Sequence, residues 1–164
     1  MRRSILGVVV LVCLMALTPV AVVQGSAKRI AGGVFGGTTS QGYPVLIEVS
    51  KLGLKVSRVL TAMDLPCLHP PQYTNPEAYR GLPVSLTGKF AYSYKNIKGV
   101  GLPNEGISSF VYSGSIAGQF NKAGTRVTGT WREHLTAYSA ADPTGATVLD
   151  DCDSGVVKFT ARRG

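Results

Sequence analysis

Histidine, cysteine, tryptophan and acidic residues are all scarce in this sequence. Its 164 residues include two His, three Cys, one Trp and nine Asp or Glu, against 17 Lys or Arg. Two histidines leave little room for a His-rich metal site, and the motifs Gly-x-Ser-x-Gly, His-Glu-x-x-His and the Walker loop are missing. The sequence thus lacks the signatures of serine hydrolases, zinc proteases and phosphate-loop NTPases, and we expect no cofactor and no bound metal ion.

Apolar residues at helical spacing are also missing, and short alternating runs take their place. In Arg126–Leu135, for example, Val127, Trp131 and Leu135 share one face, which is the period of a half-buried strand. Glycine-containing turns at Leu52–Gly53 and Lys122–Gly124 separate neighbouring runs. The predicted strands are Gly33–Thr38, Pro44–Lys51, Lys55–Met63, Pro83–Leu86, Lys89–Lys95, Ile107–Ser113, Ser115–Asn121, Arg126–Leu135 and Val156–Arg162. About eight or nine short strands without a strong helix predict an all-β fold, an antiparallel β-sandwich or jelly roll.

Three long segments between these strands are predicted to be loops. They are Asp64–Leu82, which is rich in proline, Asn96–Gly106, which is rich in glycine, and Ala137–Asp151. Loops of this length in a compact β domain are usually functional or mobile.

The first 27 residues have the pattern of an export signal. A basic start, Met1–Arg3, precedes the apolar run Ile5–Val23, and small residues allow cleavage after Gly25 or Ala27. The alternative is an uncleaved membrane anchor, because a run of about 19 residues is nearly long enough to span a bilayer. We predict a helical signal peptide over residues 1–27 and one domain over residues 28–164, secreted or held at the cell envelope without membrane contact after cleavage.

Two cysteines, Cys67 and Cys152, remain after Cys13 is removed with the signal peptide. An even pair in an exported protein is far more often structural than catalytic, so we predict a disulfide. A reactive cysteine assisted by His69 or His134 is the alternative.

The positive charge is spread along the chain without a block of five or six basic residues. Solubility is the common reason for such a charge, and attraction to an anionic surface such as a wall polymer is the functional one. Nucleic acid is not expected as a partner of an exported chain.

An acidic run, Asp150–Asp153, contains a fragment of a calcium loop. The fragment lacks the later Glu that calcium loops use as a bidentate ligand. We therefore predict that these carboxylates accept backbone N–H bonds as caps.

Two glutamates are candidates for glycoside hydrolysis, which needs a pair of carboxyl groups about 5–10 Å apart. Glu133 follows Trp131, and Glu48 lies in the middle of a predicted strand. The simpler interpretation is that Glu48 faces solvent and that Glu133 lies near a strand end. Trp131 itself, like Phe90, is expected in the core.

Tyrosines are the remaining candidates for ligand binding. Tyr92, Tyr94 and Tyr112 are predicted to form a platform for sugar rings, with Lys89 and Lys95 near its edge.

Four short motifs resemble a group of small secreted actinobacterial proteins. The motifs are Gly37–Gln41, Gly129–Trp131, Cys152–Gly155 and Phe159–Arg162, and the similarity extends from about Val34 to Arg163. Phe159 stands where that group is expected to have tryptophan. The resemblance implies a single β-sandwich domain behind a signal peptide, a paired set of cysteines and no assigned activity or catalytic residue.

Together these features predict an exported, non-enzymatic β-sandwich protein that binds carbohydrate or an anionic wall polymer. The alternatives are a jelly-roll glycoside hydrolase using Glu48 and Glu133, and a protein-interaction module with an exposed strand edge. The oligomeric state stays open.

Overall fold

The computed structural model describes residues 30–69 and 72–164, and the regular secondary structure in these residues is antiparallel β-strand apart from one short 3₁₀ turn. The predicted signal peptide therefore lies outside the described residues. The strands are β1 (Gly33–Thr39), β2 (Pro44–Val49), β3 (Lys55–Leu65), β4 (Tyr73–Pro83), β5 (Lys89–Val100), β6 (Ile107–Phe120), β7 (Arg126–Ser139), β8 (Val148–Asp153) and β9 (Val157–Arg163), with one 3₁₀ turn, η1 (Pro103–Glu105).

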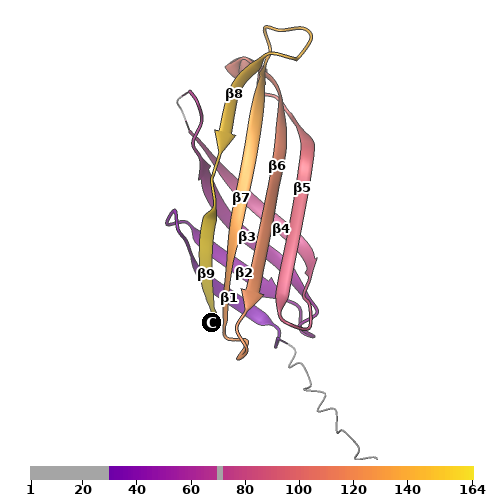
Figure 1. Ribbon diagram of the computed structural model, residues 1–164, viewed down its shortest axis with the longest axis vertical. Coiled ribbons are helices and arrows are strands. Elements are labelled where there is room, and N and C mark those ends of the chain that lie inside the picture. The colour runs from indigo at the N-terminus through magenta and orange to yellow at the C-terminus, as the bar shows by residue number, and fades with distance from the viewer. Residues whose placement is uncertain (1–29, 70–71) are drawn as a thin grey trace, which may run out of the picture.

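All of these strands belong to one sheet, in the order β4-β3-β2-β1-β9-β7-β6-β5, with β8 paired to the remaining part of β7. Figure 1 shows β5, β6 and β7 along the long axis of the molecule, in front of the obliquely crossing strands β1 to β4. The sheet curves so far that its two end strands, β4 and β5, approach each other. Their rings touch, with centroids 5.8 Å apart for Tyr79 and Tyr92. We call this line of approach between β4 and β5 the seam.

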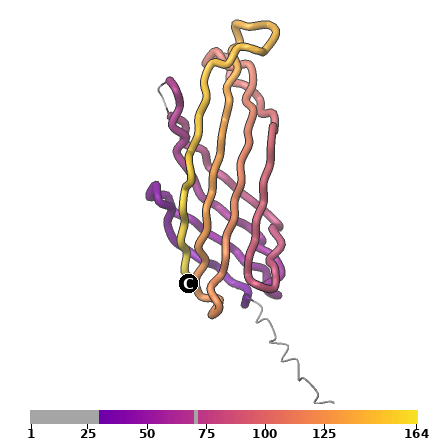
Figure 2. Tube along the Cα trace, viewed as in Figure 1, coloured from indigo at the N-terminus to yellow at the C-terminus, as the bar shows by residue number. Residues whose placement is uncertain are grey.

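The predicted all-β, antiparallel class is confirmed, but the sandwich or jelly-roll arrangement is not. The structure has one nearly closed sheet, in which β1 pairs with both β2 and β9 and so joins the two layers (Figure 2). Alternation along a strand determines which side chains face inward, whereas it contains no information about which strand becomes the neighbour.

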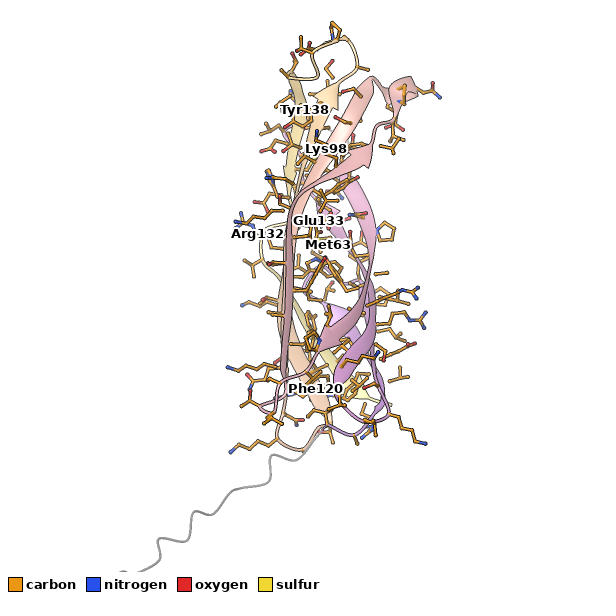
Figure 3. The ribbon with its side chains drawn as sticks, turned by 90° about the vertical axis from the view of Figure 1, so that its right-hand side faces the viewer. Met63, Lys98, Phe120, Arg132, Glu133 and Tyr138 are labelled. Atoms are coloured by element: carbon orange, nitrogen blue, oxygen red, sulfur yellow. A yellow bond between two sulfur atoms is a disulfide. The ribbon has the colours of Figure 1, made fainter. Side chains whose placement is uncertain are left out.

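Inward-facing side chains of both layers form the hydrophobic core inside the curved sheet. Phe90 is 3% exposed and Trp131 is 1% exposed, which confirms both as core residues. Val127 and Leu135 share their face of β7 with Trp131, as the alternation predicts. Figure 3 shows Met63 and Phe120 between the two layers, at different heights along the molecule.

The prediction of a long proline-rich loop over Asp64–Leu82 is wrong for most of that segment. Its second half is β4, which pairs with β3 in a regular register that includes Pro76 opposite Ala62. Proline lacks the N–H needed inside a sheet, and it is tolerated here because β4 is an end strand. The strand predicted at Pro83–Leu86 is absent, since β4 ends at Pro83.

Three other strand boundaries also differ from prediction. The segments Ile107–Ser113 and Ser115–Asn121 are one strand, β6, continuous through Gly114. A Cβ at Gly114 would lie 2.7 Å from the Tyr94 hydroxyl oxygen, so this glycine makes room for a ring instead of ending the strand. β5 continues into the predicted loop Asn96–Gly106, and β8 occupies the end of Ala137–Asp151.

Cys67 and Cys152 form the predicted disulfide, with the sulfur atoms 2.06 Å apart and a sequence separation of 85. The bridge attaches the end of the β3 segment to β8. Asp150 supports the same junction, because its Oδ1 accepts backbone N–H bonds from Leu68 (3.0 Å) and His69 (3.2 Å). Within the described ranges, no helix has the length and apolar character needed to cross a bilayer.

Candidate functional site

Glu133 is a charged residue type in the middle of the core. It lies on β7, two residues after Trp131 and two before Leu135, so the strand alternation directs its side chain inward. Its exposed fraction is 0%. Figure 3 shows it at about the height of Met63, between the two layers of the curved sheet. The expectation that Glu133 lies near a strand end is wrong, because β7 continues to Ser139.

A second carboxyl group, that of Glu77 on β4, faces Glu133 from the opposite wall. The side-chain amide of Asn75 joins them: its Nδ2 donates to Glu77 Oε1 at 2.9 Å and to Glu133 Oε1 at 2.7 Å. The two carboxyl groups are within hydrogen-bonding reach of each other, so each influences the ionisation of the other. We call Glu77 and Glu133 the carboxyl pair.

The pair is short of positive charge. Among the described residues, neither Glu77 nor Glu133 forms a salt bridge with a basic side chain. Burial first, and then the negative charge of Glu77, raise the pKa of Glu133 to about 7, against the opposing effect of the Asn75 hydrogen bond. Burial also raises the pKa of Glu77. Two adjacent carboxylates in a poorly solvated interior cannot both ionise cheaply, so near neutral pH the pair retains about one proton.

Two buried polar atoms beside the pair lack hydrogen-bond partners among the described residues. They are Oε2 of Glu133 and Nε1 of Trp131. The indole N–H only donates, and a carboxylate oxygen only accepts. One face of β7 thus offers an unused donor and an unused acceptor.

Three tyrosines lie between the carboxyl pair and the outside. We call Tyr79 on β4 with Tyr92 and Tyr94 on β5 the tyrosine cluster. Tyr79 packs on Trp131 with ring centroids 5.3 Å apart, and its hydroxyl lies 3.4 Å from that of Tyr94. Burial raises the pKa of both Tyr79 and Tyr94, which keeps these hydroxyls neutral. Tyr92 is 47% exposed and forms the outer end of the cluster at the seam.

The five predicted ligand-binding residues divide between two faces. Tyr92 and Tyr94 lie on the inner side of β5, and Tyr112 of β6 is partly buried against Phe110, at a centroid distance of 5.9 Å. Lys89 and Lys95 are exposed and alternate with the inward residues, which places them on the outer face of β5. The structure therefore brings Tyr92 and Tyr94 together on the inner face of β5, whereas the two lysines lie on its outer face.

Glu48 does not join Glu133. It alternates with the buried residues Ile47 and Val49, and its carboxylate accepts a hydrogen bond from Arg58 on the outer side of the sheet. The simpler interpretation of Glu48 as a solvent-facing residue is confirmed. The carboxylate that does meet Glu133 is that of Glu77, which lies within Asp64–Leu82, the segment predicted to be a loop.

A signal for Glu77 was present in the sequence. Tyr73, Asn75, Glu77 and Tyr79 occur at every second position, and all four are buried more deeply than the residues between them. Pro76 concealed this period, because a proline within a run argues against a strand.

The acidic run Asp150–Asp153 acts locally. Besides the two loop N–H groups, Asp150 accepts one from Asp151 at 2.9 Å, so it caps backbone as predicted. Oδ1 of Asp151 lies 2.8 Å from Nε2 of His134, and Asp153 forms a salt bridge with Arg132. Asp150 also lies close to both cysteine sulfurs, which are bonded to each other and so are not free to ligate a metal ion.

No protein-family model, curated protein or solved structure matches this chain. Its class therefore rests on its own geometry: an antiparallel all-β protein whose single sheet curves almost closed around a buried carboxyl group, that of Glu133, and a half-buried one, that of Glu77.

Proposed function

We propose that this protein is an exported, non-enzymatic binding protein that recognises carbohydrate, including that of anionic wall polymers, at the seam between β4 and β5. The observation that carries the proposal is the exposed ring of Tyr92, which continues inward through Tyr79 to the carboxyl pair. Sugar rings combine apolar faces with hydroxyl groups, so they suit a site in which aromatic rings adjoin hydrogen-bond acceptors.

The disulfide supports the proposed location outside the cytoplasm, because such bonds persist in oxidising compartments. The basic composition supports an anionic partner. Lys89 and Lys95 lie on the outer face of β5, within the strand that also carries Tyr92 and Tyr94, and would attract the polymer backbone while the tyrosines bind a ring.

Glycoside hydrolysis is the weaker candidate. A pair formed by Glu48 and Glu133 would span the two faces of the sheet. The carboxyl groups of Glu77 and Glu133 share one amide donor and lie within hydrogen-bonding reach of each other, closer than the separation of about 5 Å or more that glycoside hydrolysis uses.

Binding of the exported, oxidised protein to insoluble cell-wall polysaccharide tests the proposal. We expect Tyr92→Ala to reduce retention about tenfold, because stacking on an aromatic ring contributes on the order of 1 kcal/mol or more. Tyr138→Ala is the matched control, since Tyr138 is also partly exposed but lies on β7, which is not one of the two strands that form the seam.

The contribution of charge is measured in the same assay. Replacement of Lys89 and Lys95 by serine should weaken retention at low salt and have little effect at high salt, because exposed charges are screened. Lys51 and Lys55, replaced in the same way, are the control pair outside β5.

Equal retention of the Tyr92 and Tyr138 variants would contradict the proposed site.

A further inference from the structure

The two unpartnered atoms of the interior define what a ligand must supply. Trp131 and Glu133 are two residues apart on the same face of β7, so their side chains lie about 7 Å apart along the strand. Nε1 of Trp131 needs an acceptor, and Oε2 of Glu133 needs a donor. Both residues are almost completely buried, at 1% and 0% exposure, and leaving such groups unpaired is costly.

The carboxyl pair also lacks a positive charge nearby. The donors that reach it within the described residues are neutral: the amide of Asn75, and the hydroxyl of Tyr94 beside Glu133. The surroundings are aromatic, with the rings of Tyr79 and Trp131 packed edge to face beside the pair. Carboxylates and aromatic faces together favour an organic ammonium group. Calcium takes six to eight oxygen ligands, more than two carboxyl groups and one amide supply.

We propose that the interior beside Glu133 binds an ammonium group with a neighbouring hydroxyl, as found in an amino sugar. The ammonium donates to the carboxyl pair, and the hydroxyl oxygen accepts the indole N–H of Trp131. This inference rests on the proposed function and specifies its ligand as a carbohydrate with a free amino group.

The ligand must pass the tyrosine cluster to reach this position. Tyr92 is the exposed member, and the contact between the Tyr79 and Tyr94 hydroxyls spans the seam below it. The two end strands are not hydrogen-bonded to each other, so these side chains can separate without loss of a strand pair. The ammonium then replaces the proton that the pair retains near neutrality, and binding releases that proton to the solvent.

Calorimetric titration at about pH 6.5 with three methyl glycosides tests the inference. The probes are methyl glucosaminide, its N-acetyl derivative and methyl glucoside, which differ only at one carbon of the ring. We expect the glucosaminide to bind about tenfold more tightly than the other two, and its apparent enthalpy to depend on the buffer because a proton is released. Fluorescence of Trp131, the single tryptophan, should change on binding.

Glu133→Gln should remove the preference for the glucosaminide, whereas Glu48→Gln should retain it. Glu77→Gln provides the same test should the Glu133 variant fail to fold, as judged by near-ultraviolet circular dichroism. Equal affinity for the three glycosides, or a preference that survives both Gln variants, overturns the ammonium site while the proposed carbohydrate function stands. If none of the glycosides binds but wall polysaccharide is still retained through Tyr92, the interior site fails alone. Loss of both binding results means that the proposed function fails.

Discussion

Glu133 is an acidic residue in surroundings that are unusual for a carboxyl group. It is the fully buried acid of the described chain, and its neighbours are a second carboxyl group, an amide and tyrosines. Burying a charge in such surroundings is expensive unless the group retains a proton or acquires a cationic partner. The inside of the curved sheet is therefore sensitive to protons and to cations.

The raised pKa of Glu133 predicts a pH-dependent stability. The folded state retains a proton up to about pH 7, whereas the unfolded chain releases it near the ordinary value of 4.5. The folded state therefore binds more protons in this interval, and the free energy of unfolding should fall as pH rises from about 4.5 to 7, by roughly 2–3 kcal/mol. Chemical denaturation at a series of pH values measures the slope.

Glu133→Gln should flatten this slope, because glutamine cannot ionise. The facing groups that contribute to the same titration are Glu77 of β4, Tyr94 of β5 and Tyr112 of β6. Glu48→Gln is the control and should retain the slope, since Glu48 pairs with Arg58 on the outer face. A slope unchanged in the Glu133 variant would show that the pair does not hold the proton.

At the scale of elements, glycines allow close contact between neighbouring strands. A Cβ at Gly129 of β7 would lie 2.2 Å from the Ala117 carbonyl oxygen of β6 and 2.3 Å from the Phe159 ring of β9. Gly118 of β6 stands opposite Gly129 and lies against the Phe90 ring in the same way. Two large rings can therefore pack over the centre of the sheet because the two residues between them have no side chain.

Gly129→Ala should consequently destabilise the fold by about 1–3 kcal/mol, through overpacking of strand and ring. Gly36→Ala is the matched control: it is also a strand glycine, but a Cβ there meets nothing within 4 Å. We expect that control to be neutral or slightly stabilising. Thermal unfolding of both variants measures the difference, and equal midpoints would mean that the sheet adjusts around Gly129 without cost.

At the scale of the whole molecule, the disulfide joins two distant parts of the chain. It closes a loop of 85 residues between the end of the β3 segment and β8. Replacing Cys67 and Cys152 by serine should lower stability by about 2–5 kcal/mol, since the bridge restricts the unfolded chain. Denaturant unfolding of the double variant and of the oxidised protein measures this loss, and coincident curves would contradict it.

Export makes a prediction for the same pair of cysteines. The intact mass of the protein in the medium should start after Gly25 or Ala27 and should increase by two hydrogens on reduction. Cys13→Ser should change neither result, because Cys13 is removed with the predicted signal peptide. A full-length mass confined to the membrane fraction would instead identify residues 5–23 as an anchor.

The sequence by itself determined the all-β class, most strand positions, the core roles of Trp131 and Phe90, and the pairing of Cys67 with Cys152. These features depend on local alternation, on turn residues and on the parity of the cysteines, and each can be recognised along the chain. The continuity of β6 through Gly114 could not be recognised, because the ring that the glycine accommodates comes from another strand. The strand around Pro76 does show alternation, but the proline argues against a strand unless its place at the end of the sheet is known.

Only the tertiary structure decided which carboxyl groups meet. Glu48 and Glu133 were the plausible partners in sequence, yet strand alternation places Glu48 outside, and the curvature of the sheet brings Glu77 of β4 across to β7. Strand order and closure depend on pairings between residues far apart in the chain, such as β1 with β9. Such pairings arise from the packing of the whole sheet around one interior, and no local pattern specifies them.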